Sequence, residues 1–199
     1  TALHEERLDG VLDQLRGVEV ESVLDLGCGT GALLERLVAD PQLIRIVGVD
    51  RSLPSLDAAR SRLVSPGGAL DPRLGLRQGT LLDLDHDLTG FDAAVLLETI
   101  EHLDPAHLSR LERSLFLRLR PGRVIVTTPN REYNVLFGLE PGERRHPDHR
   151  FEWDRAKFER WASGVASRTG YEVTFEPLGP VHETLGGPSQ MAVFVRSSP

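Results

Sequence analysis

A glycine-rich turn directly after an apolar segment constrains this chain more than any other feature. Residues 23–26 read Val-Leu-Asp-Leu, as in a buried strand, and residues 27–31 read Gly-Cys-Gly-Thr-Gly. Glycine lets the backbone turn tightly and lets a ligand approach it closely. A helical pattern of leucines follows at residues 33–38, with Thr30 as the expected N-cap. This order of strand, turn and helix predicts a nucleotide-binding edge of an α/β sheet.

The rest of the chain alternates between apolar strands and amphipathic helices. Strands that are apolar throughout and joined by helices predict a parallel sheet that is covered on both faces. Residues 129–150 show no period and predict a long loop, which in a compact domain is usually functional or disordered. A second segment rich in glycine and proline covers residues 177–190. The expected helices are 4–16, 54–63, 107–119 and 154–168, and the further expected strands are 44–49, 73–79, 92–97, 124–127, 171–175 and 191–195.

Composition narrows the class of protein. The chain has 199 residues, 23 Lys and Arg against 30 Asp and Glu, and a net charge of −7. Residues 1–199 suit a single domain, with no apolar run approaching the ~20 residues of a membrane span. The negative charge argues against bulk binding to DNA or to a membrane surface. Because Cys28 is the single cysteine, we expect a reducing, cytoplasmic location, and because Thr1 replaces an initiator Met we expect a domain excised from a longer protein.

Asp50 indicates a ligand that contains a ribose. It ends the second expected strand about 20 residues after the turn, where a carboxylate can hydrogen-bond both ribose hydroxyls. The turn lacks the spacing of the dinucleotide fingerprint and the lysine of a P-loop. Residues 23–31 and 48–50 instead resemble the first two motifs of class I S-adenosylmethionine-dependent methyltransferases. A Rossmann-like domain that binds another nucleotide is the alternative.

The resemblance implies an α/β, Rossmann-like fold with a seven-stranded, mostly parallel sheet whose last strand is antiparallel. It implies that Asp50 holds the ribose and that the turn lies against the methionine part of S-adenosylmethionine. We expect Cys28 to fill a tight space, and Asp83 either to lie near the adenine or to be a solvated turn residue. The cofactor-binding residues that the resemblance implies are Asp25, Gly27, Gly29, Thr30, Asp50, Arg51, Ser52, Thr80, Leu81 and Leu97.

Carboxylates and imidazoles follow the fourth expected strand. In a helical turn, Glu98, Glu101 and His102 would stand at i, i+3 and i+4 and converge on one side. Two neighbouring carboxylates repel each other unless a cation or a proton intervenes. His146 and His149 lie in the loop after the fifth strand, at the same edge of the sheet. These donors suit Mn²⁺ or Mg²⁺, with Zn²⁺ or Fe²⁺ open on ligand type, whereas a solvated helix start is the alternative.

Three segments sharpen the expected function. Residues 98–103, 128–134 and 146–153 resemble, in this order, motifs of the small-RNA 3′-terminal ribose 2′-O-methyltransferases, in particular the bacterial branch used in RNA repair. That resemblance implies methylation of the 2′-hydroxyl of a 3′-terminal nucleotide and a polynucleotide kinase-phosphatase-ligase as partner. The metal ligands that it implies are Glu98, Glu101, His102 and His149.

The same residues suggest how the reaction selects an RNA end. A terminal ribose has adjacent 2′- and 3′-hydroxyls that can chelate one metal, whereas an internal 3′-oxygen is esterified. The metal stabilises the 2′-alkoxide as its proton leaves. His102, His146 and Glu101 are the catalytic candidates, with His146 or solvent as the proton acceptor.

The long loop carries the candidate RNA contacts. Arginine binds phosphate through paired hydrogen bonds, and exposed aromatic rings stack on bases. Tyr133 and Phe137 are the expected stacking residues, whereas Phe151 and Trp153 are expected to pack in the core, and His182 is a further candidate near the site. The RNA-binding residues that we expect are Arg131, Tyr133, Arg144, Arg145 and Arg150.

Two other functions fit parts of the pattern. A metal-dependent O-methyltransferase for a small vicinal diol shares the chelation argument but leaves the arginines of the loop unexplained. A non-catalytic domain that binds a repair partner predicts damage to the glycine turn, to Asp50 or to the Glu and His motif, and the sequence shows none.

Overall fold

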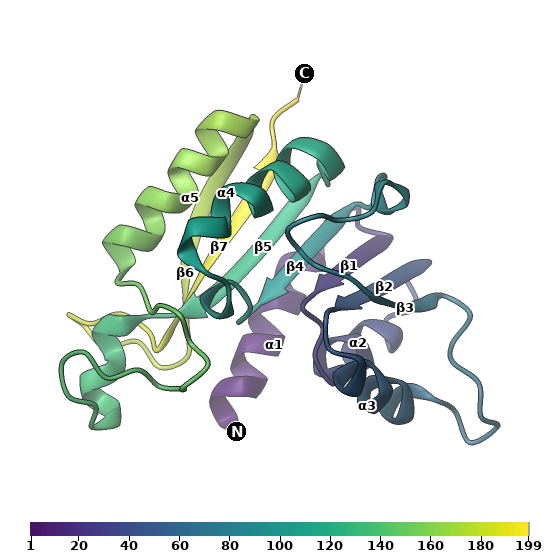
Figure 1. Ribbon diagram of the computed structural model, residues 1–199, viewed down its shortest axis with the longest axis horizontal. Coiled ribbons are helices and arrows are strands. Elements are labelled where there is room, and N and C mark those ends of the chain that lie inside the picture. The colour runs from purple at the N-terminus through teal and green to yellow at the C-terminus, as the bar shows by residue number, and fades with distance from the viewer. Residues whose placement is uncertain (199) are drawn as a thin grey trace.

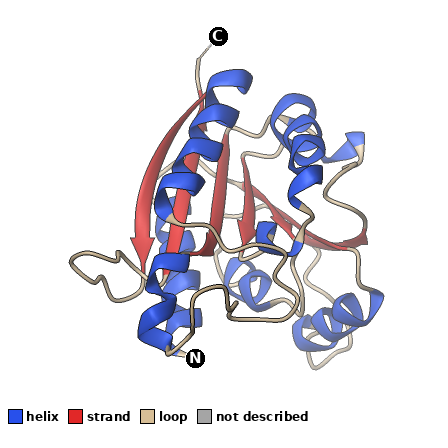
Figure 2. Ribbon diagram, turned by 60° about the vertical axis from the view of Figure 1, so that its left-hand side comes forward, coloured by secondary structure: helices blue, strands red, loops and turns tan. Residues whose placement is uncertain are grey.

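The computed structural model describes residues 1–198 as a seven-stranded sheet between two layers of helices (Figures 1 and 2). The strand order is β3-β2-β1-β4-β5-β7-β6. Strand β7 is antiparallel to β5 and β6, and the other neighbouring pairs are parallel. This confirms the predicted sheet. The strands are β1 (Ser22–Leu26), β2 (Arg45–Asp50), β3 (Leu74–Gln78), β4 (Ala93–Leu97), β5 (Arg123–Pro129), β6 (Tyr171–Leu178) and β7 (Ser189–Arg196).

Helices cover both faces of the sheet, as the uniformly apolar strands predict (Figure 1). Leu24 and Leu26 face one core with Phe116 and Phe158, and the preceding Val23 faces the opposite core. The helices on the first face are α4 (Leu108–Leu111), continued by a π-helical segment (Glu112–Leu119), and α5 (Arg155–Thr169). Those on the second face are α1 (Ala2–Leu15), α2 (Ala32–Val38) and α3 (Leu53–Leu63). None of the helices within residues 1–198 combines the length and the hydropathy needed to cross a bilayer.

Capping side chains mark the starts of α1, α3 and α5, but not those of α2 and α4. Asp154 caps α5 as expected, because its carboxylate accepts a hydrogen bond from the Lys157 N–H at 2.8 Å. The prediction that Thr30 caps α2 is wrong. Helix α2 begins at Ala32, and its N-cap is Gly31 at φ +92°, with no side-chain cap bond among the described residues. The glycine turn is therefore one residue longer than a threonine cap requires.

The loop after β5 contains regular structure that its sequence does not reveal. A 3₁₀ helix, η5 (Arg131–Phe137), follows the strand directly. It is capped by Asn130, whose side-chain oxygen accepts the Glu132 N–H at 3.1 Å. A 3₁₀ helix of this length has no apolar face with a 3.6-residue period, so a search for helical periodicity misses it. Together with the turns after β1 and β4, this loop lies at the carboxyl edge of the sheet.

Candidate active site

The glycine turn lies at the carboxyl edge and is tied to β2. The backbone N–H groups of Gly27 and Cys28 both donate to the Val49 carbonyl, at 2.8 and 3.0 Å. Gly27 has φ +80°, and a Cβ atom there would lie 2.6 Å from Cγ2 of Thr99. Glycine at this position therefore allows the turn to lie directly against the loop that follows β4. Cys28 is buried, as its expected space-filling role requires.

Asp50 is held at the rim of a cavity by two backbone donors. One carboxylate oxygen accepts the Gly29 N–H at 2.9 Å, and the other accepts the Ser52 N–H at 2.9 Å. Ser52 itself begins α3 as its N-cap. Asp25 lies beneath this carboxylate, and burial, followed by the charge of Asp50, raises the pKa of Asp25 to about 7. A fixed carboxylate at the rim is the arrangement that a ribose diol requires.

The cavity has a volume of about 420 Å³ and includes most of the expected cofactor residues. Among the described residues, Asp25, Thr30, Ser52 and Leu97 are outside its lining. Asp83 also lies outside it, because its side chain is 70% exposed and pairs with Arg118. The predicted lining residues are Gly27, Gly29, Asp50, Arg51, Thr80 and Leu81, joined by Glu98 and His102 of the metal motif. Gly79 and Leu82 flank the expected Thr80 and Leu81, whereas sequence reasoning missed Ser55, Thr99 and Leu103 as lining residues.

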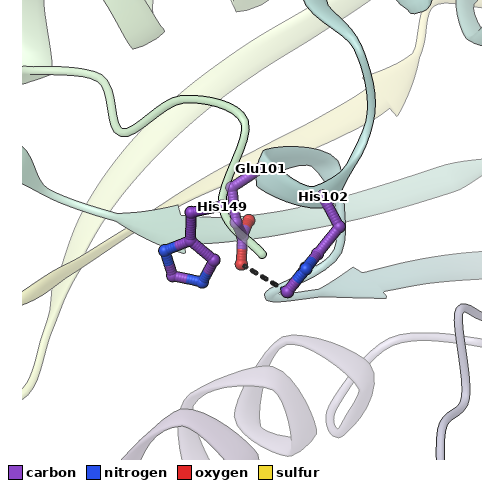
Figure 3. A group of neighbouring side chains, drawn as sticks. All are labelled: Glu101, His102 and His149. Carbon is purple, nitrogen blue, oxygen red and sulfur yellow. Dashed lines mark ion pairs between the residues drawn. The ribbon is translucent and has the colours of Figure 1, made fainter. Parts of the chain in front are cut away.

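Beside this cavity, three side chains bring their ligand atoms together (Figure 3). The atoms of Glu101, His102 and His149 lie within 4.8 Å of one another. His102 Nε2 is 4.0 Å from Glu101 Oε2. Glu101 and His102 come from the 3₁₀ turn η2 (Ile100–His102) after β4, and His149 comes from the loop after β5. Loops that the sequence separates by almost 50 residues thus meet where the sequence analysis expects a metal.

Glu101 has an unsatisfied oxygen in this group. Its side chain is fully buried, and Thr128 Oγ1 donates to its Oε1 at 2.8 Å. Its Oε2 has no hydrogen-bond partner among residues 1–198. Burial and then the charge of Glu98 raise the pKa of Glu101 well above its ordinary value. A divalent cation would satisfy the free oxygen and favour the ionised carboxylate, so these residues fit a metal.

Of the two histidines, His102 is the one whose surroundings favour the neutral imidazole. Nδ1 of His149 lies 2.5 Å from Glu152 Oε2, so its Nε2 is free to face the group. Burial raises the pKa of Glu152, but hydrogen bonds from His149 and Asn134 outweigh it and hold the pKa below its ordinary value. Partial burial, followed by the charges of His149 and His146, lowers the pKa of His102. A deprotonated imidazole is the form that ligates a cation.

Glu98, the fourth expected ligand, is held differently. Its carboxylate forms an ion pair with Arg7 at 2.9 Å and accepts hydrogen bonds from Ser189 at 3.2 Å and Thr127 at 2.8 Å. It therefore lies outside the three-residue group of Glu101, His102 and His149. His146 is beside that group, with its ring centroid 5.6 Å from that of His149 and its side chain 54% exposed.

Comparisons with known proteins agree with this geometry. Residues 23–122 match the family described as "Methyltransferase domain". The chain is 41% identical to the methyltransferase domain of bacterial CtHen1-C. The match covers 98% of this chain and 100% of that chain, and the two structures superpose with a TM-score of 0.87. This chain belongs to the family of Hen1 methyltransferase domains. Its fold is that of class I S-adenosylmethionine-dependent methyltransferases.

Two further relatives place the Hen1 domain in longer proteins. The small RNA 2′-O-methyltransferase of Gallus gallus is 35% identical over 99% of this chain, which spans 54% of that relative. The chain thus covers about half the length of the curated relative. A structure of a Pnkp1/Rnl/Hen1 RNA repair complex is 23% identical, with 98% of this chain and 42% of that chain covered and a TM-score of 0.73, and shows the shared fold alone.

The expected RNA-binding residues of this chain divide into two groups. Arg131 and Arg150 have side chains that are 59% and 56% exposed, although they pair with Asp154 and Asp104. Arg145 is partly buried and shapes the loop, because it donates to the Asn134 side chain at 2.6 Å and to the Asn130 carbonyl at 2.7 Å. Arg144 donates to the His149 carbonyl at 2.9 Å. Arg145 and Arg144 therefore support the ligand-bearing loop, which the sequence alone does not indicate.

The aromatic residues of the loop are placed as the sequence analysis expects. Phe151 and Trp153 are buried and stacked on each other, with ring centroids 4.3 Å apart. Tyr133 packs against Phe137, which is 49% exposed. A hollow of about 620 Å³ in this Hen1 domain includes Arg131, Arg144 and Lys157 in its lining. His182 lies in a different hollow, of about 290 Å³, between β6 and α5, so its expected place at the site is not supported.

Proposed function

We propose that this chain methylates the 2′-hydroxyl of the 3′-terminal nucleotide of RNA, with S-adenosylmethionine as methyl donor. The carrying observation is that Glu98 and His102 line the 420 Å³ cavity beside the glycine turn, while His102 also belongs to the group with Glu101 and His149. A methyl donor in this cavity would therefore stand next to whatever those side chains hold. The relative from Gallus gallus, a small RNA 2′-O-methyltransferase, supports RNA and its 2′-oxygen as the acceptor.

A divalent cation, Mn²⁺ or Mg²⁺, would be held by Glu101, His102 and His149, with Glu98 as fourth ligand. When bound it would supply positive charge that lowers the pKa of a ribose hydroxyl. Asp50 would accept hydrogen bonds from the ribose of the methyl donor, because its two oxygens are already fixed by backbone N–H groups.

His146 would accept the proton of the 2′-hydroxyl in this proposal. The Asp148 N–H donates to its Nδ1 at 3.1 Å, so in the neutral ring Nε2 carries the hydrogen and Nδ1 is the basic nitrogen, which would take up the proton on releasing this hydrogen bond. Its ring lies 6.3 Å from that of His102, between centroids, and is open to solvent. The electrophile is a sulfonium and needs no further activation, so the residues mainly orient the acceptor oxygen and receive its proton.

The RNA would enter over the loop after β5. Arg131 and Arg150 present exposed guanidinium groups on the loop that also carries His149, and they would bind phosphates. These arginines favour RNA over the second candidate, a small vicinal diol, which needs no phosphate contacts. A kinase-phosphatase-ligase partner in RNA repair and a cytoplasmic location remain parts of the proposal.

Methyl transfer to short RNAs of one sequence tests the proposal. The substrates end in a 2′,3′-diol, a 2′-deoxy sugar or a 3′-phosphate, and each is tried with Mn²⁺ and with a chelator. We expect transfer to the diol in the presence of Mn²⁺, and at most traces elsewhere. Equal transfer to all three ends, or transfer that survives the chelator, would overturn the mechanism.

A pair of variants separates catalysis from folding in this test. Glu101→Gln keeps the shape of the buried side chain but removes its charge, so we expect methyl transfer to be lost while S-adenosylmethionine still binds. Glu19→Gln is the control, because Glu19 is exposed and distant from the cavity lining. Full activity of Glu101→Gln would exclude Glu101 from the reaction.

A further inference from the structure

Arg7 connects the first helix of the chain to the candidate site. Its side chain is 17% exposed, and its guanidinium Nη2 lies 2.9 Å from Glu98 Oε1. Arg7 Nε donates to Ser189 Oγ at 2.8 Å, and Ser189 Oγ donates to the same Glu98 oxygen at 3.2 Å. Helix α1, β7 and the loop after β4 therefore meet in one closed network around a single carboxylate.

The other oxygen and the backbone of Glu98 are held as well. Thr127 Oγ1 donates to Glu98 Oε2 at 2.8 Å. The Glu98 residue itself has φ +51°, one of two positive values at non-glycine positions among the described residues. Such a conformation is strained and persists where surrounding contacts impose it. The contacts of Glu98 with Arg7, Ser189 and Thr127 are the ones that can impose this conformation.

This arrangement separates Glu98 from the residues with which it shares a motif. The converging ligand atoms within residues 1–198 belong to Glu101, His102 and His149, and Glu101 Oε2 is left without a hydrogen-bond partner. A guanidinium and a divalent cation compete for the same carboxylate, because each needs its negative charge. In this structure the Arg7 guanidinium is paired with the Glu98 carboxylate.

We propose that Arg7 is a positioning residue that holds Glu98 outside the group of Glu101, His102 and His149, so that a divalent cation gains Glu98 as a ligand by displacing the guanidinium. This inference rests on the metal dependence in the proposed function. According to this inference, helix α1 regulates cation binding, although α1 contributes none of the predicted metal ligands. The guanidinium that is released then becomes free to pair with an anionic group of the substrates.

Mn²⁺ binding to the purified protein tests this inference without any methyl transfer. Free Mn²⁺ is followed by electron paramagnetic resonance during titration of wild type, Arg7→Met and Arg7→Lys. We expect Arg7→Met to bind Mn²⁺ about tenfold more tightly, since one charge-assisted contact no longer competes. Arg7→Lys keeps a positive charge and should lie near wild type. A purely structural role for Arg7 would not produce this order.

Two controls make the result specific to Glu98. Arg16→Met carries the same substitution on the flank of α1, where Arg16 is 64% exposed and 3.8 Å from Asp13, so its Mn²⁺ affinity should match wild type. The double variant Arg7→Met with Glu98→Gln should lose the gain, because the released carboxylate is gone. Circular dichroism melts with and without Mn²⁺ give a second readout, in which Arg7→Met shows the larger Mn²⁺-induced rise in Tm.

The outcomes separate this inference from the proposed function. If wild type binds Mn²⁺ and Arg7→Met binds it equally or more weakly, the inference is overturned and the proposed function stands. If neither protein binds Mn²⁺, both are overturned. A gain in affinity that persists in the double variant would also overturn the inference, because the effect would then not act through Glu98.

Discussion

The His149 imidazole, a candidate metal ligand, is oriented by one neighbouring side chain, that of Glu152. Glu152 accepts from His149, from the Asn134 amide at 2.8 Å and from the Arg145 N–H at 2.9 Å, and its side chain is 1% exposed. A carboxylate behind a metal-binding histidine fixes the tautomer and raises the basicity of the ring. Glu152 would thus act on a cation bound at this group through His149 and not by contact.

Replacing Glu152 should weaken metal binding without removing a ligand. We expect Glu152→Gln to lower the affinity for Mn²⁺ about 10- to 100-fold, because the amide no longer holds the imidazole proton on Nδ1 as strongly. Calorimetric titration with Mn²⁺ measures this change. Glu140→Gln, an exposed position in the same loop, serves as control and should match wild type. An unchanged affinity in Glu152→Gln would show that Nδ1 needs no carboxylate.

At the scale of single residues, the sequence predicts the candidate metal ligands better than the residues that hold those ligands in place. Glu101, His102 and His149 are recognisable because their residue types and spacing suit a metal, and the structure brings them together. Arg7 and the pairing of Glu152 are not recognisable in advance. Arg7 lies 91 residues from Glu98, and their contact depends on how α1 packs on the sheet. Such tertiary ion pairs leave no local pattern in the chain.

The turn between β1 and α2 acts as a unit, and its first glycine is the most constrained. Gly27→Ala should lower the free energy of unfolding and the affinity for S-adenosylmethionine, because its Cβ would lie 2.6 Å from Thr99. Gly17→Ala is the matched control, with φ +74° and open space around the added Cβ. Both variants carry the left-handed strain of about 1–2 kcal/mol.

Chemical denaturation and cofactor titration of the two variants distinguish the steric clash with Thr99, which only Gly27→Ala has, from the backbone strain that both variants share. We expect Gly17→Ala to lose only stability, whereas Gly27→Ala loses further stability and binds S-adenosylmethionine more weakly. If the two variants behaved alike, the close approach of the turn to the loop after β4 would have no role in cofactor binding.

Helices and strands are predictable from the sequence where the period of the apolar residues and the capping residues indicate the same bounds. All seven strands lie close to their expected segments. The central strands β1, β4 and β5 are largely apolar because they are buried on both faces, whereas β3 and β6 are partly exposed. The start of α2 was misplaced, because Gly31 and not Thr30 occupies the N-cap. Helix η5 was missed for want of a 3.6-residue period. These two errors concern loop geometry at the carboxyl edge, where tertiary contacts override local preference.

The charge of the whole molecule limits how it can bind RNA. The net charge is −7, yet Arg131 and Arg150 are exposed in the loop after β5, which also carries His149. A long RNA would gain phosphate contacts at this loop and meet a repulsive surface elsewhere. Binding should therefore depend on the 3′ end and hardly on RNA length.

Equilibrium binding to RNAs that share a 3′ end but differ several-fold in length measures this directly. We expect similar affinities per end, weak binding to duplex DNA, and a slope of log K against log salt of about −1 to −2, as two or three arginine–phosphate contacts give. Arg131→Gln or Arg150→Gln should each reduce that slope by about 0.7, whereas Arg16→Gln on α1 should leave it unchanged. Affinity that rises steadily with RNA length would require a basic track away from this loop, and confinement to the RNA end would then be wrong.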